Sequence, residues 1–274
     1  MLTDDHLGAI AGRLVEVPGV EAVVLGGSRA RGTHHPDSDV DLGLLYTARG
    51  LDLTALRAAA AEIAGTEVEV AGPGGWGPWV DGGAWLRIDG TAVDLILRDA
   101  SRVREQRDRA LRGEFTVHQQ TGHPLGFLDV AYAAEVAICR PLADPGGLAE
   151  VLRSGLLPYP SALRDTLIGH LWTAEFIAAG GAKVAGRGDL AFVQMCAASA
   201  LLWCAHAWHA EAGEWATTEK GLVPGVAALH IDTHGFADAA AAALSLSDPA
   251  ELASGALALV RATQRRLGRE NRPS

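Results

Sequence analysis

Two aspartates, Asp39 and Asp41, open the apolar run Val40–Tyr46, and their spacing points to metal chemistry. On a strand, residues two apart point to the same face at a separation of about 7 Å, so both carboxylates are aimed at one place. Acids this close repel each other unless a cation lies between them. Magnesium bound to a triphosphate is such a cation, because it takes one or two carboxylates together with phosphate oxygens.

A third acid, Asp94, lies in the apolar stretch Ala92–Leu97, where a carboxylate is costly unless it is used. Val93 and Leu95 share one strand face and Asp94 takes the other. If this strand lies beside the Val40 strand, Asp94 completes a two-metal site. One metal would lower the pKa of an attacking hydroxyl, and the other would neutralise a triphosphate and its leaving pyrophosphate. The alternatives are a structural edge-strand aspartate and, for the first pair, a solvated acidic turn.

A glycine-rich loop precedes these acids and is a candidate phosphate cradle. Gly27 lets the backbone approach a phosphate closely, and Ser28 and Arg29 add a hydroxyl donor and a positive charge. The loop lacks the ending of a P-loop, and a plain turn is the alternative. Of the two lysines, Lys220 in the polar loop Thr217–Gly221 is the better candidate for a triphosphate clamp, against an ordinary exposed lysine.

Two other metal sites are rejected on their spacing. An EF-hand calcium loop needs glycine and glutamate at positions where this chain has Leu42 and Ala48. Cys204, His206 and His209 lie close in sequence, but they lack the spacing of a zinc motif. We therefore expect these three residues to be part of ordinary helix packing.

The surrounding pattern predicts a fold of the α+β class. Hydrophobic periodicity predicts helices over residues 3–16, 53–63 and 101–112, and strands over residues 20–25, 40–46, 67–71, 84–88 and 91–97. After residue 112 the strand signals stop, and Ala/Leu-rich helices continue to residue 268. We expect a domain with a small mixed sheet flanked by helices over residues 1–115, followed by an all-α helical bundle over residues 116–274.

Three features in order carry a resemblance to a known family: Gly27-Ser28, then Asp39-Val40-Asp41, then a lone strand aspartate, Asp94. This pattern, over roughly residues 20–98, resembles the DNA polymerase beta-like nucleotidyltransferase superfamily. The helical second half is similar in architecture to that of the kanamycin and streptomycin adenylyltransferases.

The resemblance assigns roles to residues of this chain. It implies that Ser28 contacts the triphosphate. It also implies a site with two Mg²⁺ ions, both of which are bound by Asp39 and Asp41. Asp94 would help to bind one ion and activate the acceptor hydroxyl. The substrate would be ATP or another nucleoside triphosphate.

Charge and composition bear on the acceptor and on the location. The formal net charge is −10, and residues 113–260 hold 15 acidic and 6 basic residues. An acidic surface repels nucleic acid and attracts cations, although solubility alone explains it equally well. The acidic start, the three scattered cysteines and the polar interruptions of the apolar segment 190–208 favour a cytoplasmic protein with a buried helix and no membrane span.

The expected function is transfer of AMP from ATP to a hydroxyl of a small cationic acceptor, such as an aminoglycoside-like antibiotic, with release of pyrophosphate. Such an activity would confer antibiotic resistance. A protein-modifying, antitoxin-like adenylyltransferase and a non-catalytic nucleotide-sensing module are the alternatives. The sequence leaves open the oligomeric state, and also whether the loop with Trp76 and Trp79 stacks on a ligand or only connects two strands.

Overall fold

A computed structural model of the chain describes residues 2–35 and 37–268 and divides into two compact units. The first unit contains the chain up to residue 110 together with residues 115–157. The second contains residues 111–114 and the chain from residue 158 onward. The sequence placed the change of domain after residue 115, whereas in the structure residues 115–157 pack with the first unit.

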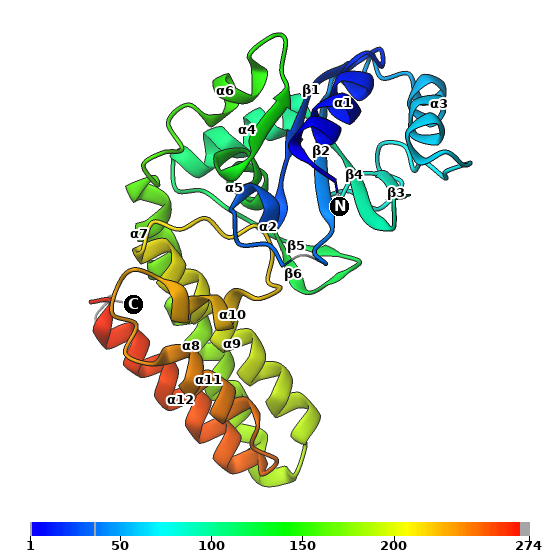
Figure 1. The fold of residues 1–274 in the computed structure, drawn as a ribbon. Helices are drawn as coiled ribbons and strands as arrows, with labels where there is room; N and C mark the ends of the chain where they lie inside the picture. Colours follow the sequence, from blue (N-terminus) through cyan, green and yellow to red (C-terminus); the bar gives the residue numbers. More distant parts are fainter. Residues whose placement is uncertain (1, 36, 269–274) are drawn as a thin grey trace. The chain divides into compact units, whose positions relative to one another are not determined.

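The first unit holds the mixed sheet and its helices (Figure 1). Its elements in chain order are α1 (Asp4–Val15), β1 (Val20–Leu25), α2 (Gly27–Ala30), β2 (Val40–Tyr46), α3 (Leu53–Ala64), β3 (Gly83–Ile88), β4 (Thr91–Asp99), α4 (Ala100–Leu111), β5 (Val117–Gln120), β6 (His123–Leu128), α5 (Ala131–Ile138), β7 (Arg140–Ala143) and α6 (Leu148–Arg153).

Five strands form the main sheet in the order β3-β4-β2-β1-β7, and β5 and β6 form a separate two-stranded sheet. Strands β2 and β4 pair in parallel, and the other neighbours in the main sheet are antiparallel. A mixed sheet with flanking helices, followed by a helical region, confirms the predicted α+β class. The parallel pair places two segments far apart in sequence side by side at the centre of the sheet.

One face of the sheet packs on the main hydrophobic core, because alternate strand residues are apolar. Leu42 of β2 and Leu95 of β4 are buried there against Leu14 of α1 and Leu56 of α3. The alternation forces the intervening residues of β2, β4 and β3 onto the opposite face. On that face Arg98 of β4 is buried and forms an ion pair with Glu135 of α5, so this part of the second face is covered.

Two expectations about strands were wrong. Residues 67–71 form no strand; only Ala71 makes an isolated bridge, to Gly83, while Val70 is buried in the core. The alternation there reflects side-chain packing without a hydrogen-bonded partner strand. Strands also continue after residue 112, since β7 pairs with the edge of β1 and β5 pairs with β6. These strands are four to six residues long, and β6 and β7 each contain a Pro, so their periodicity is too short to recognise.

The second unit is helical. Its elements are α7 (Ser161–Gly169), α8 (Leu171–Val184), the 3-10 turn η1 (Ala185–Arg187), α9 (Leu190–Glu211), α10 (Leu222–Gly225), the 3-10 turn η2 (Val226–Ala228), α11 (Phe236–Leu244) and α12 (Pro249–Arg266). Small residues such as Ala174 of α8 and Ala200 of α9 let these helices pack closely around Trp208 and Phe236.

Within the described ranges, α9 is one helix that is long and apolar enough to cross a membrane by length and composition alone. Its most apolar window of 18 residues has a mean hydropathy of 1.5, and 44% of that window is buried. A core helix of a globular unit passes the same test, so the observation is weak evidence for a membrane span.

Candidate functional site

The register of the sheet brings Asp41 and Asp94 side by side. In the parallel pair of β2 and β4, Asp41 lies directly opposite Asp94, and in the hairpin of β3 and β4, Asp94 lies opposite Trp85. At the end of β1, the Gly26 amide donates a hydrogen bond of 2.8 Å to the Asp41 carbonyl. Directly paired residues present their side chains on the same face. We call this row of Trp85, Asp94, Asp41 and Gly26 the carboxylate rung.

The glycine turn closes against the carboxylate of Asp41. Gly27 has φ of +59°, and a Cβ atom built on it would lie 1.9 Å from Asp41 Oδ2. A side chain at this position would therefore collide with the carboxylate and would also strain the backbone. The turn begins the single-turn helix α2, in which Ser28 is half-buried. The predicted phosphate loop and a predicted metal ligand are thus neighbours in space.

Arg29 holds the loop that leads into β2. Its Nη2 donates to the Ser38 carbonyl at 2.8 Å, and its Nε donates to the Asp39 carbonyl at 3.1 Å. Asp39 itself is exposed and lies one residue before β2 begins. The guanidinium therefore positions the backbone of Asp39, and its predicted contact with a phosphate stays a prediction.

Two of the three predicted metal ligands, Asp41 and Asp94, are neighbours on adjacent strands. The third, Asp39, lies in the loop just before β2. Among residues 2–35 and 37–268, no group of three His, Cys, Asp or Glu side chains is arranged to hold a metal ion. The donor set nevertheless fits magnesium, which prefers carboxylate oxygens and commonly takes only one or two from the protein. Two acids on adjacent strands also repel each other, and a cation relieves that repulsion.

Trp85 is the residue of the carboxylate rung that sequence reasoning missed. Its side chain is 68% exposed and stacks on Trp76, with ring centroids 4.4 Å apart and planes 16° apart. The signal was present in the hairpin turn, because a two-residue turn at Asp89-Gly90 pairs Ile88 with Thr91 and hence Trp85 with Asp94. Counting three residue pairs along the hairpin from Ile88 and Thr91 leads to Trp85 opposite Asp94.

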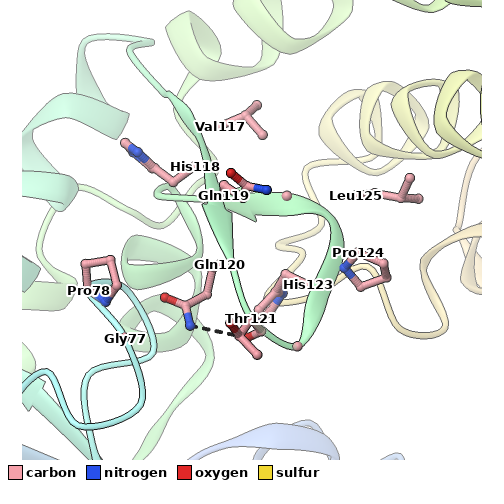
Figure 2. A pocket seen from close by; sticks show the side chains of 12 residues that line it. Gly77, Pro78, Val117, His118, Gln119, Gln120, Thr121, His123, Pro124 and Leu125 are labelled. Atoms are coloured by element: carbon pink, nitrogen blue, oxygen red, sulfur yellow. Dashed lines mark hydrogen bonds between the residues drawn. The ribbon is translucent and has the colours of Figure 1, made fainter.

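A pocket of about 850 Å³ adjoins the Trp76 loop (Figure 2). It is lined by Gly77, Pro78 and residues 117–126, and therefore lies along the hairpin of β5 and β6. Gln120 connects this hairpin to the loop: its Nε2 donates to the Trp76 carbonyl at 2.8 Å, and its Oε1 accepts from the Trp79 amide at 3.0 Å. The Trp79 ring stacks on His118 at 3.8 Å. Both tryptophans of this loop are thus packed on other aromatic rings.

The hairpin is itself fixed by a buried acid. Asp129 is 1% exposed, accepts from the Thr116 amide at 2.8 Å and pairs with Arg109 at 2.5 Å. His118 Nε2 lies 3.2 Å from the same carboxylate. These contacts give Asp129 a structural role, because its charge is neutralised within the unit.

The remaining candidates lie in the second unit. Lys220 belongs to a polar loop before α10, and its backbone amide donates to Thr218 Oγ1 at 3.3 Å. Its predicted contact with a triphosphate stays a prediction. Cys204 is buried, and burial raises the pKa of its thiol to about 12, while His209 Nε2 lies 3.1 Å from the Leu222 carbonyl. Cys204 is thus a packing residue, as the sequence indicated.

Residues 9–73 match the nucleotidyltransferase domain family. The matched segment contains the glycine turn, Asp39 and Asp41, and ends before Asp94. It supports a nucleotidyltransferase as the general activity and a nucleoside triphosphate as a substrate. The register of β2 and β4 places Asp94, which lies outside the matched segment, directly opposite Asp41.

One solved structure similar to this chain is a nucleotidyltransferase-like protein from Exiguobacterium sibiricum 255-15. The sequences are 12% identical, the TM-score is 0.47, and the alignment covers 96% of this chain and 74% of that one. A comparison with curated protein sequences found no match.

Proposed function

We propose that this protein transfers a nucleoside monophosphate, with ATP as the first candidate donor, to a hydroxyl of a small cationic acceptor and releases pyrophosphate. The observation that carries the proposal is the pairing of Asp41 with Asp94 directly beside the Gly27 turn. The match of residues 9–73 to nucleotidyltransferase domains supports the class of reaction. The acceptor chemistry rests on the formal net charge of −10, which favours a cation over nucleic acid.

In this proposal the glycine turn and the three aspartates have different roles. The Gly27-Ser28 turn would bind the β- and γ-phosphates, because successive backbone N–H groups in such a turn can donate hydrogen bonds to phosphate oxygens. Asp41 and Asp94, with Asp39 from the preceding loop, are the residues that would hold magnesium. Bound magnesium supplies neutralisation of the triphosphate charge and a lowered pKa for the acceptor hydroxyl.

Asp94 is the base in this proposal. A carboxylate oxygen of Asp94 takes the proton of the acceptor hydroxyl as its oxygen forms a bond to the α-phosphorus. The bond from that phosphorus to the bridging oxygen breaks, and pyrophosphate leaves with the electron pair. Asp94 then gives the proton to solvent. The products are the nucleotidylated acceptor and pyrophosphate.

Pyrophosphate release tests the proposal directly. The purified chain is incubated with magnesium, each of the four ribonucleoside triphosphates, and a panel containing kanamycin and streptomycin. We expect release that requires both a nucleotide and an acceptor, and its loss in Asp94→Asn. The matched control is Asp89→Asn in the turn of the same hairpin, where the residue is exposed at φ of +49°, a conformation that Asn tolerates equally well.

Equal activity in Asp94→Asn and in the control would refute the role of Asp94. Absence of release with every acceptor, together with transfer of label from ATP to a protein, would replace the small acceptor by a protein side chain.

A further inference from the structure

The exposed tryptophan of the carboxylate rung lies at the opposite end from the phosphate turn. Trp85 on β3, Asp94 on β4, Asp41 on β2 and Gly26 after β1 follow one another across neighbouring strands. Neighbouring strands are about 4.8 Å apart, so Trp85 is one strand from Asp94 and two strands from Asp41. An apolar ring with 68% of its surface exposed thus flanks the carboxylates.

We propose that the stacked pair of Trp76 and Trp85 is the platform on which the acceptor binds. The proposal rests on the proposed function and deepens it by assigning the acceptor to one end of the carboxylate rung. A sugar-like ring carrying ammonium groups suits this place. Its apolar C–H face stacks on the exposed indole, and its positive charge is attracted by the ring faces and by Asp94.

The direction of the reaction separates the acceptor from the leaving group. In phosphoryl-type transfer, the attacking and leaving oxygens lie roughly in line on opposite sides of the phosphorus. The leaving pyrophosphate belongs at the Gly27 turn, so the attacking hydroxyl must approach from the side of Asp94 and Trp85. The nucleotide base is not constrained in this way, because it extends from the ribose attached to the α-phosphate.

The platform is held rigidly before any ligand binds. The Trp76 amide donates to the Asp81 carbonyl at 2.8 Å, and the Trp76 carbonyl accepts from Gln120 at 2.8 Å. Buried Asp81 also accepts from Tyr46 Oη and from the Gly74 amide, each at 2.8 Å. Burial and the bond to Asp81 raise the pKa of Tyr46, so its hydroxyl remains a donor. A surface fixed in this way binds without a large ordering cost.

In this proposal the rest of a multi-ring acceptor extends from the platform toward the pocket of about 850 Å³, whose lining includes neither Trp76 nor Trp85. The pocket begins at Gly77 and Pro78, directly after Trp76, and continues along residues 117–126 of the hairpin. Pro124 and Leu125 are labelled along its β6 side in Figure 2. Its lining residues are uncharged apart from the histidines, so a cation entering it meets no Lys or Arg among them.

The test measures binding of donor and acceptor separately in Trp85→Ala. Calorimetry gives the affinity of the full-length protein for magnesium-ATP, and in separate titrations for kanamycin and for streptomycin. We expect acceptor affinity to fall by about tenfold, because stacking and cation–π contacts are lost together, while ATP affinity changes by less than about twofold. Trp85→Phe should recover most of the acceptor affinity. The matched control is Trp172→Ala, which removes a tryptophan that is 59% exposed in the second unit.

Each other result overturns the platform. A fall in ATP affinity with unchanged acceptor affinity would assign Trp85 to the base. Kanamycin and streptomycin affinities that are unchanged in Trp85→Ala would refute the platform for this class of acceptor. So would the absence of binding of both compounds to the wild-type chain. Failure of the proposed function is distinguishable: binding that depends on Trp85 without pyrophosphate release would refute transfer and keep the platform. Pyrophosphate release that is unchanged in Trp85→Ala would support transfer and refute the platform.

Discussion

Strand β4 carries two charged side chains, Asp94 and Arg98, on the same face and four residues apart. Their electrostatic surroundings are opposite. Arg98 is buried and meets Glu135 of α5 through two bonds, of 2.6 Å from Nε and 2.8 Å from Nη2. Asp94 is half-buried and lies opposite another acid, Asp41. Arg98 therefore faces an opposite charge, whereas Asp94 faces a like charge.

Under the proposed function, the first pair is structural and the second is functional. Burial by itself lowers the pKa of Arg98, but the neighbouring Glu135 more than offsets this, so the pKa is raised and the guanidinium stays charged. That ion pair is complete within the fold. Neighbouring carboxylates repel each other, and the proposed function assigns a cationic ligand to Asp41 and Asp94. The following predictions test this contrast, from the largest expected effect to the smallest.

Asp41→Asn should separate activity from stability. The change removes one of two repelling charges with little change of shape, so the free energy of unfolding should stay the same or rise by up to about 1 kcal/mol. Pyrophosphate release should fall by roughly a thousandfold, equivalent to about 4 kcal/mol of transition-state stabilisation. Urea unfolding and steady-state kinetics on one preparation measure both. A large loss of stability would make Asp41 a structural residue.

Glu135→Ala should have the reverse effect. It leaves the Arg98 guanidinium buried without its carboxylate, which should cost about 3 kcal/mol of unfolding free energy. The double variant Arg98→Met with Glu135→Met removes both charges and should recover much of that loss. Activity measured below the unfolding transition should stay within about threefold of wild type, because neither residue is in the carboxylate rung. A double variant as unstable as the single one would contradict this account of the pair.

Gly27→Ala should displace the Asp41 carboxylate. The added methyl group would start 1.9 Å from Asp41 Oδ2, so we expect activity to fall by about 30-fold, or about 2 kcal/mol. Gly32→Ala is the matched control, since Gly32 also has a positive φ of +70° and nothing lies within 4 Å of its Cβ position. It carries the same backbone strain without the collision. Equal losses in the two variants would show that strain alone is responsible.

Arg29→Ala should have the smallest effect, about a tenfold loss of activity, because the loop before Asp39 loses its hydrogen bonds. Arg29→Lys keeps the charge but lacks the planar guanidinium fork, whose separate Nε and Nη2 donors reach the Asp39 and Ser38 carbonyls. If Arg29 acts by holding the loop, lysine should behave like alanine. If it acts as a phosphate ligand, lysine should restore most of the ATP affinity. Arg57→Ala, at an exposed position of α3, controls for the loss of one positive charge.

Local sequence predicted the elements with strong, uninterrupted periodicity. The strands 20–25 and 40–46 match β1 and β2, and the helix 53–63 matches α3 to within one residue. The periodicity of such a segment indicates which of its residues face the core, whatever its partner in the fold. The short strands β5, β6 and β7 were missed, because segments of only four to six residues carry too little periodicity. Their place in the first unit depends on partners elsewhere in the chain.

By itself the sequence determined the glycine turn, the spacing of Asp39 and Asp41, and the burial of one face of each central strand, because these depend on residues close together in the chain. Only the tertiary structure decided that Asp94 lies opposite Asp41 and that Gly27 touches its carboxylate. The parallel register of β2 and β4 joins distant segments, and it is set by the packing of both strands on one core. That packing brings separate acids together as a candidate site.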